Sequence, residues 1–296
     1  MKKIFFISVL SSFFLACEKE IELKSDEITP RIVVNSLFTA NDTIQLSVSE
    51  SRSVLYEGIL PNVTNATAKL FDGNGALLGT FTHIENGNYL LADVLPIDGS
   101  TYTLEVAAPG FETVTASSST PAIINITSID TATQFLTYPQ LQFDIAFNDV
   151  PSQKNYYGIR ITSEVYDIDP ETEEKTLLYK NTGFNSREFY IVNGYEDVDG
   201  EIYGNELYFS DETFNGQTNI FTARTYRNEL TEFQEGFYVV SIISMSEELF
   251  KYNVTFSKYQ EAQGDFFAEP VRVYSNVENG FGIFGGSSVE SDTIYF

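Results

Sequence analysis

The sequence has very little of four things that many functional sites need: cysteine, histidine, tryptophan and positive charge. Its 296 residues include one Cys, one His and no Trp, and 17 basic residues stand against 42 acidic ones, a net charge of −25. A single Cys excludes a disulfide framework and a Cys-rich zinc site, and a single His excludes a multi-His metal centre. The excess of negative charge repels phosphate, so binding of nucleic acid through a basic face is also excluded.

The first 16 residues have the pattern of a secretory leader. Lys2 and Lys3 precede an apolar stretch, residues 4–15, that is too short to span a bilayer as a helix. Phe14-Leu15-Ala16-Cys17 resembles the lipobox of bacterial lipoproteins, although Leu is commoner than Phe at the first position. The resemblance implies that 1–16 is a signal peptide and that Cys17 carries fatty-acyl chains such as palmitate, which anchor the protein to a membrane. The alternative is an ordinary signal peptide followed by a chance Cys.

An acidic run directly follows the cysteine: Glu18, Lys19, Glu20 and Glu22. It resembles the export signal that sends Bacteroidota lipoproteins to the outside of the outer membrane. The alternative is that these residues only begin a solvated linker. Both interpretations predict that residues 17–30 form a flexible tether.

Short runs of alternating apolar and polar residues begin at Arg31, and this period of two is typical of strands in a half-buried sheet. Asn- and Gly-rich turns at 72–75 and 86–88 are strong hairpin signals. Seven strands in under a hundred residues predict an immunoglobulin-like sandwich over 31–118, and we place the domain boundary in the polar segment 117–121. The expected strands are 31–38, 43–48, 66–71, 77–83, 89–94, 102–106 and 112–116.

The remainder, 119–296, is predicted to be a larger β-rich domain with one helix, so the fold class of the whole chain is all-β. Ser244-Met-Ser-Glu247 has the spacing of a capping box and predicts a helix that ends at Gly264. A shorter helical piece is expected near 228–235. The expected strands are 141–147, 156–166, 175–181, 188–192, 206–210, 218–226, 237–244 and 270–275.

Several short motifs of this second part occur together, and the segment from Glu269 to Gly285 is the most specific of them. With the lipobox and the sandwich, they make the chain resemble a family of uncharacterised Bacteroidota outer-membrane lipoproteins, a domain of unknown function often encoded beside TonB-dependent receptors. The resemblance implies a TonB-dependent outer-membrane receptor as partner, and it implies no reaction and no cofactor. The motif residues are Asp149, Asn155, Tyr156, Asp211, Asn215, Gly216, Glu269, Pro270, Asn276, Glu278, Gly280 and Gly282.

Glycines alternate with apolar residues in the last part of this segment. The pattern predicts a terminal strand whose backbone crosses closely packed chain. A phosphate-binding loop is the alternative, but no Lys follows the glycines and no helix start is indicated.

Two acidic clusters could supply oxygen ligands to Ca²⁺: Asp167 with Asp169, and Asp197 with Asp199. Neither has the spacing of an EF-hand loop, because the Gly at 200 comes too early and a later Glu is lacking. We therefore expect solvated hairpin tips, with a weak calcium site as the alternative. No other metal site is predicted.

We expect no enzymatic activity. His83 stands at a strand end beside a hairpin turn, where a half-buried His is ordinary. Asp149, Asp211, Glu269 and Glu278 are candidates for a glycosidase pair, but they are distant in sequence and their separation cannot be read. The many tyrosines of the second part are expected to pack on sheet faces.

These observations predict a lipid-anchored protein facing the cell exterior that serves as an accessory subunit of a TonB-dependent receptor or transport system. The alternative is a stand-alone surface module that binds a nutrient such as a peptide, glycan or metal chelate. A surface hydrolase, or a structural part of an outer-membrane secretion or assembly complex, is less favoured.

Overall fold

The structure, a computed structural model, describes residues 29–53, 56, 58–135, 139–151, 153–263 and 268–295. The predicted signal peptide, the predicted lipid anchor Cys17 and the predicted export tag Glu18, Lys19, Glu20 and Glu22 lie outside the described residues. The chain divides into two compact units, one comprising Met1–Thr29 and Arg52–Ile59 and the other Pro30–Ser51 and Leu60–Phe296. In the described part of the first unit, the Tyr56 amide donates to the Ser53 carbonyl, 2.9 Å away, and closes a short turn. All features below belong to the second unit.

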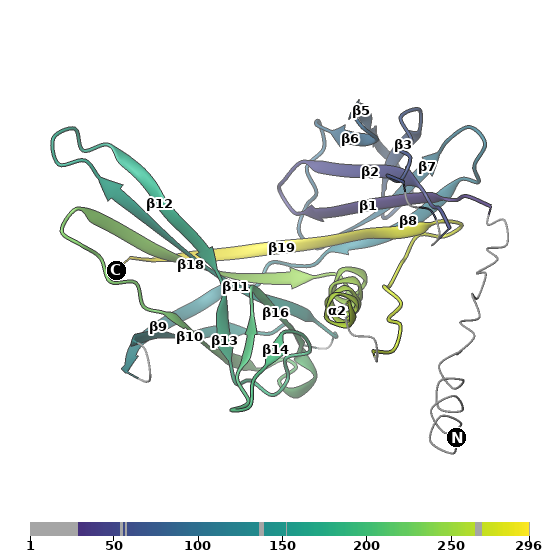
Figure 1. The fold of residues 1–296 in the computed structure, drawn as a ribbon. Coiled ribbons are helices and arrows are strands. Elements are labelled where there is room, and N and C mark those ends of the chain that lie inside the picture. Colours follow the sequence, from purple (N-terminus) through teal and green to yellow (C-terminus); the bar gives the residue numbers. More distant parts are fainter. Residues whose placement is uncertain are drawn as a thin grey trace, which may run out of the picture. The chain divides into compact units, whose positions relative to one another are not determined.

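The described chain is mostly β-structure with a single α-helix, which confirms the predicted fold class. Its strands form three sheets (Figure 1). The largest has the order β12-β11-β18-β19-β1-β2-β6-β5, with β16 also paired to β11. The second has the order β14-β15-β13-β17-β10-β9, and the third β4-β3-β7-β8.

The first part of the chain contains all of the strands that its alternating pattern predicts. The predicted strand 77–83 divides in two, because the chain leaves one sheet after Thr80 and joins another at Thr82. Residues 117–120, in the segment where the domain boundary was placed, belong to the strand that pairs with 100–107, so the polar serines alternate within a ladder. The strands are β1 Ile32–Thr39, β2 Ile44–Glu50, β3 Thr67–Asp72, β4 Leu77–Thr80, β5 Thr82–Glu85, β6 Asn88–Leu91, β7 Ser100–Ala107 and β8 Val114–Thr120.

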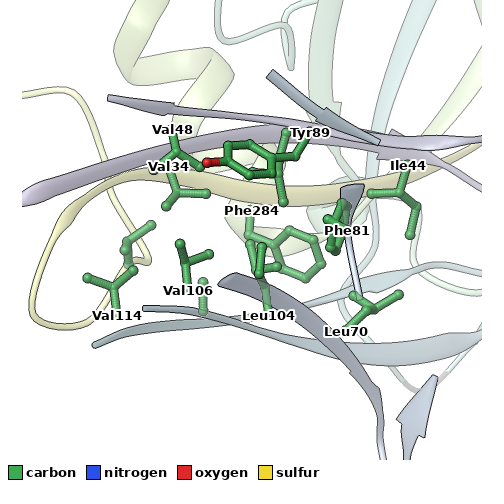
Figure 2. Close-up of a cluster of buried hydrophobic side chains, with 14 of the residues drawn as sticks. Val34, Ile44, Val48, Leu70, Phe81, Tyr89, Leu104, Val106, Val114 and Phe284 are labelled. Carbon is green, nitrogen blue, oxygen red and sulfur yellow. The ribbon is translucent and has the colours of Figure 1, made fainter. Parts of the chain in front are cut away.

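The core of this part lies between two sheets. Every second side chain of β1 and β2 is buried, for example Val34 and Leu46, and meets Leu70 and Leu104 from the facing sheet. Figure 2 shows that Phe284, far away in the sequence, lies among these side chains. Its ring stacks on Phe38 with the centroids 4.5 Å apart. The sandwich is therefore completed by a residue from the end of the chain.

The second part also encloses a core between two sheets, formed mainly by β10 and β17 on one side and β11, β16 and β18 on the other. Aromatic rings dominate it, and Phe209 contacts the rings of Tyr157, Tyr190 and Phe221. The strands are β9 Ile126–Phe135, β10 Pro139–Asn148, β11 Tyr156–Ile168, β12 Lys175–Thr182, β13 Phe184–Ser186, β14 Tyr195–Glu196, β15 Ile202–Gly204, β16 Glu206–Ser210, β17 Thr218–Tyr226 and β18 Gln234–Met245.

Three predicted elements of the second part are wrong. Residues 188–192 turn rather than extend, and the nearby strand is β13. Residues 270–275 are irregular because their backbone bonds elsewhere: the Tyr274 amide donates to Thr255 Oγ1, 2.9 Å away on the helix. The region 228–235 is not helical, since the Asn228 amide donates to the Tyr238 hydroxyl and the chain then enters β18.

The last strand, β19 (Phe281–Tyr295), connects the two parts. Residues Phe281–Ser287 run parallel to β1, and Ser287–Tyr295 run antiparallel to β18. In Figure 1 the yellow strand follows first one partner and then the other. The expectation of a glycine-containing terminal strand against closely packed chain is confirmed: a Cβ at Gly282 would collide with the Val34 carbonyl, and one at Gly286 with the Ser119 carbonyl.

The helix α2 (Glu247–Ala262) follows β18 directly. Its N-cap is Ser246, whose Oγ accepts from the Leu249 amide at 3.2 Å, and not Ser244 as the sequence spacing suggested. Ser244 is still part of the ladder with β11 and β19, and so cannot cap the helix. The predicted stop at Gly264 lies outside the described residues. Within the described ranges, no helix has both the length and the apolar character needed to cross a membrane.

Candidate functional site

Five of the family-motif residues lie in two loops that contact each other. Asp149 and Asn155 are in the loop between β10 and β11, and Asp211, Asn215 and Gly216 are in the loop between β16 and β17. The buried Asp149 carboxylate accepts hydrogen bonds from the Gly216 amide at 2.6 Å, from Asn155 Nδ2 at 3.2 Å and from the Tyr157 hydroxyl. Asn155 Nδ2 also lies 3.2 Å from Asp211 Oδ2. Asn215 Nδ2 donates to the Gln153 carbonyl at 2.9 Å. We call Asp149, Asn155, Tyr157, Asp211 and Gly216 the loop network.

The loop network places two carboxylates in a buried setting. Burial raises the pKa of Asp211, its backbone hydrogen bond with Asn155 lowers it, and the nearby Asp149 charge raises it. Burial and the hydrogen bond to Asp149 also raise the pKa of the Tyr157 hydroxyl. Both oxygens of Asp149 are occupied by donors from the protein, so this carboxylate holds the two loops in place rather than offering a free base.

The raised pKa of Asp211 has a consequence for stability. A carboxyl group whose pKa is higher in the folded state favours folding most at low pH, and this contribution is lost as the pH rises through the folded-state pKa. Asp211→Asn removes the ionisation and keeps an oxygen that can accept from Asn155. We therefore expect D211N to exceed the wild type in unfolding free energy at pH 7, with the difference closing on acidification.

Urea denaturation at a series of pH values measures this difference. The exposed Asp199→Asn is the matched control, and we expect it to change stability little at pH 7. A D211N protein that is less stable than the wild type at every pH would contradict the assignment.

Two residues of the loop network, Asn155 and Tyr157, line a cavity of about 500 Å³. Residues of β8, of the end of β18 and of the start of the helix also line it. The Ser244 hydroxyl is buried there and has no hydrogen-bond partner among the described residues. Next to the loop network, Lys154 lies 2.5 Å from Glu212 and 5.6 Å above the ring of Tyr156, another motif residue. The Tyr156 ring in turn packs on Phe250 of the helix, with centroids 4.5 Å apart.

A second group of motif residues fixes the start of β19. Asn276 Nδ2 donates to the Phe284 carbonyl at 2.8 Å and the Ser117 carbonyl at 3.0 Å, and the Phe284 amide returns a bond to Asn276 Oδ1. The Glu278 amide donates to the Thr115 carbonyl at 2.8 Å. Gly280 and Gly282 follow, where the backbone runs against β1. These residues hold the terminal strand against the sandwich.

The two motif residues Glu269 and Pro270 are exposed and belong to neither group. His83 lies on β5, where its ring meets the ring of Tyr89 edge-on at 5.0 Å. The structure thus separates the candidate acids: Asp149 and Asp211 share the loop network, Glu278 binds β8, and Glu269 lies on an exposed segment.

The calcium candidates stand in turns that they stabilise themselves. Asp169 Oδ1 accepts from the Glu171 and Thr172 amides at 2.8 and 2.9 Å, and these bonds lower its pKa. Asp197 Oδ1 accepts from the Asp199 and Glu201 amides, both at 2.9 Å, and its pKa is lowered in the same way. Asp167 lies in the ladders of β11. Among the residues that the structure describes, no three His, Cys, Asp or Glu side chains are grouped to hold a metal.

A family model described as "Domain of unknown function (DUF4249)" matches residues 18–293. The chain belongs to this DUF4249 family. No curated protein matches it significantly.

Among solved structures, bovine butyrophilin is similar over 72% of the DUF4249 chain and 92% of its own, with 8% identity and a TM-score of 0.21. A chitinase, ChiA74 from Bacillus thuringiensis, covers 73% of the chain with 10% identity and a TM-score of 0.20, and the chain spans only 30% of that enzyme. Likenesses this weak carry no argument about function.

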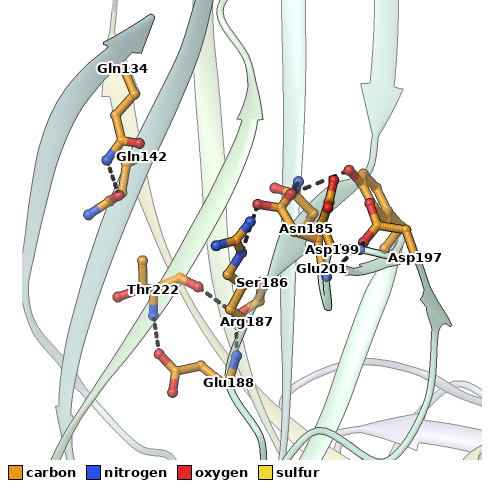
Figure 3. Close-up of polar contacts among 11 residues, drawn as sticks. Gln134, Gln142, Asn185, Ser186, Arg187, Glu188, Asp197, Asp199, Glu201 and Thr222 are labelled. Atoms are coloured by element: carbon orange, nitrogen blue, oxygen red, sulfur yellow. Dashed lines mark hydrogen bonds and ion pairs between the residues drawn. The ribbon is translucent and has the colours of Figure 1, made fainter. Parts of the chain in front are cut away.

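One buried polar group of the DUF4249 chain was missed by the sequence analysis. The Glu201 carboxylate is buried and accepts from Asn185 Nδ2 and, at 3.0 Å, from Arg187 Nε (Figure 3). Its partners are 14 and 16 residues away in the sequence, across a loop. The only signal in the sequence was a Glu at the end of an acidic cluster, which is typical of exposed residues.

Proposed function

We propose that this protein is a lipid-anchored accessory subunit, exposed on the outer face of an outer membrane, that docks on a TonB-dependent receptor. The anchor is supported by the position of the only cysteine, which ends the lipobox-like Phe14–Cys17 directly after an apolar leader. The acidic residues that follow support export to the surface, and the family resemblance supports a Bacteroidota origin. Acyl chains insert into a leaflet with about 0.8 kcal/mol for each buried CH₂, so a multiply acylated Cys17 would stay attached.

The observation that carries the docking proposal is the edge strand β12. It is the outermost strand of the largest sheet, and seven of its eight residues are exposed. Leu177, Leu178 and Tyr179 are exposed on both of its faces, and Leu178 retains 54% of its accessible surface. Apolar side chains beside unpaired backbone groups form a template for a partner's strand. The occupant that we propose is an extended extracellular segment of the receptor barrel.

Ion pairs keep the β11–β12 hairpin in shape. Lys180 Nζ lies 2.6 Å from Glu164, and Lys175 pairs with Glu235 of β18. The hydrogen bond from Lys180 lowers the pKa of the Glu164 carboxyl. The two lysines of β12 are thus paired with glutamates of neighbouring strands, while its leucines remain exposed.

Co-purification from the native cells tests the proposal. A tagged full-length protein, extracted in mild detergent, should retain an outer-membrane barrel. Leu178→Asp places a charge on the edge strand and should lose most of the barrel, whereas Leu77→Asp, at a leucine of similar exposure (55%) on β4, should retain it. The proposal fails if the wild type retains no barrel, or if the two variants retain it equally.

The anchor is tested separately. Cys17→Ala should move the protein from the membrane fraction to the soluble fraction, because no acyl chain can be attached. Retention of the variant in the membrane fraction would contradict lipidation at Cys17 without bearing on the edge strand.

A second candidate function is capture of a nutrient by the protein itself. It is favoured by a second cavity, on the polar face of the sheet that contains β10, β13 and β17. No observation favours a hydrolase or a structural part of a secretion complex, and we propose neither.

A further inference from the structure

The second cavity, of about 570 Å³, lies at the ends of β10 and β17 that are opposite to the loop network, and none of the family-motif residues lines it. Cavities of this size accept small-molecule ligands. Four of its lining residues come from paired positions of one sheet: Gln140 opposes Tyr226, and Asn185 opposes Arg224. Directly opposed residues of antiparallel strands share a face, and Arg224 and Tyr226 are two apart on β17. All four side chains therefore belong to the face that is turned away from the aromatic core.

Two oxygens at this cavity lack a donor. Asn185 is only 3% exposed, and its Nδ2 donates to Glu201, which fixes the orientation of the amide. Its Oδ1 is buried without a hydrogen-bond partner in the described chain, and so is Oε1 of Gln140. Buried acceptors are nearly always satisfied in native proteins. The two oxygens lie on β10 and β13, on either side of β17, so a ligand that satisfies both needs O–H or N–H donors at separate positions.

Arg224 is the only charged side chain that lines the cavity. Within the described ranges its guanidinium forms no ion pair with a carboxylate. The Arg224 charge acts on the carboxyl of Glu188: burial raises the pKa of Glu188, and the Arg224 charge partly lowers it. An unpaired guanidinium on a protein with a net charge of −25 is a specific place for an anion, and its planar donors fit a carboxylate.

Aromatic rings complete the lining. Tyr203 and Tyr226 are both partly exposed, to 42% and 56%. Each offers an apolar ring face beside a polar hydroxyl. A ligand with a saturated ring can place its C–H groups against such a face while its hydroxyls reach the amides of Asn181 and Asn205.

We propose that this cavity binds an acidic sugar, with a uronic acid as the recognised unit. The carboxylate pairs with Arg224, separate ring hydroxyls donate to Asn185 Oδ1 and Gln140 Oε1, and the ring lies against Tyr226 or Tyr203. A peptide is the less suitable ligand, because its backbone offers one N–H per residue, whereas a sugar ring carries several hydroxyls. The proposal does not depend on docking to a receptor.

Titration calorimetry on the detergent-solubilised full-length protein tests this. Sodium D-glucuronate and D-galacturonate are the probes, D-glucose and D-galactose are the neutral controls, and glycylglycine is the peptide arm. We expect at least one uronate to bind, with the matching neutral sugar about tenfold weaker because the charge-assisted bond to Arg224 is lost.

Arg224→Gln should weaken uronate binding about tenfold and bring it to the level of the neutral sugar. Tyr226→Ala, at an exposed ring, should weaken both sugars. Arg227→Gln removes a nearby arginine that does not line the cavity and should leave binding unchanged. The proposal is overturned if no uronate binds, if R224Q and R227Q behave alike, if neutral sugars bind as well as uronates, or if only the dipeptide binds.

Discussion

Gly282→Ala is expected to destabilise the protein by about 3 kcal/mol or more, because one methyl group there creates two separate costs. The backbone of Gly282 has φ +110°, a conformation that side chains disfavour. The added Cβ would also collide with the carbonyl of Val34 on β1. Backbone strain and overpacking each cost about 1–3 kcal/mol, and relief of one does not relieve the other.

The position of Gly282 means that this destabilisation would act on the pairing between β19 and β1 and on the core of the sandwich. It lies opposite Val34 in the parallel pairing of β19 with β1, at the point where the chain's last strand enters the sandwich. A shift of β19 away from β1 would withdraw Phe284 from the core. The strand cannot move to accommodate the methyl group without opening a cavity.

Gly110→Ala is the matched control. Gly110 also has a positive φ, +85°, but no atom lies within 4 Å of a Cβ built there. It therefore reports the backbone cost alone, about 1–2 kcal/mol. Urea denaturation measures both variants, and hydrogen exchange should show lost protection along β1 and β19 in G282A only. Equal destabilisation of the two variants would show that close packing at Gly282 has no role.

Much of the fold could be predicted from local pattern. The period of two in residues such as Ile44, Leu46 and Val48 indicates one buried face, and the Asn-Gly turns indicate hairpins. The helix was predicted from the capping-box spacing of residues 244–247, although its N-cap proved to be Ser246. What could not be predicted is partner choice. Phe281 pairs with Val33, although most of the sequence lies between them. No local sequence pattern specifies a parallel partner at such a separation.

The candidate sites show the same limit. Asp149 and Asp211 were singled out by resemblance, yet their meeting depends on Asn155, whose amide lies between the two carboxylates. Arg224 carried no signal at all, because a lone Arg in an alternating strand is typical of a solvated face. Its significance comes from Asn185, which the register of β13 with β17 places beside it. Sequence gives the residue types, while the register decides which of them share a cavity.

Asp149→Ala is expected to cost about 3 kcal/mol or more of unfolding free energy, since it removes the acceptor for three donors at once. The Gly216 amide, Asn155 Nδ2 and the Tyr157 hydroxyl all donate to this carboxylate. Tyr157 is fully buried, so its hydroxyl would lose its acceptor in the core. A buried polar group left without a partner costs about 1–3 kcal/mol, and hydrogen bonds to a charged acceptor are the stronger kind.

Two further variants separate hydrogen bonding from volume and charge. Asp149→Asn keeps the shape and one accepting oxygen, and we expect an intermediate loss. Asp199→Ala removes an exposed carboxylate at a turn tip and should change stability by less than about 0.5 kcal/mol.

Hydrogen exchange locates the effect of Asp149→Ala. The loops at 149–157 and 211–217 should lose protection, while β1 to β8 should keep theirs, because the loop network contributes no side chain to the core of the sandwich. If D149A costs no more than D199A, or if protection is lost evenly over both parts, the carboxylate does not join the two loops. Since residues of the loop at 149–157 line the first cavity, an effect confined to the two loops would also identify that cavity as the region whose shape depends on Asp149.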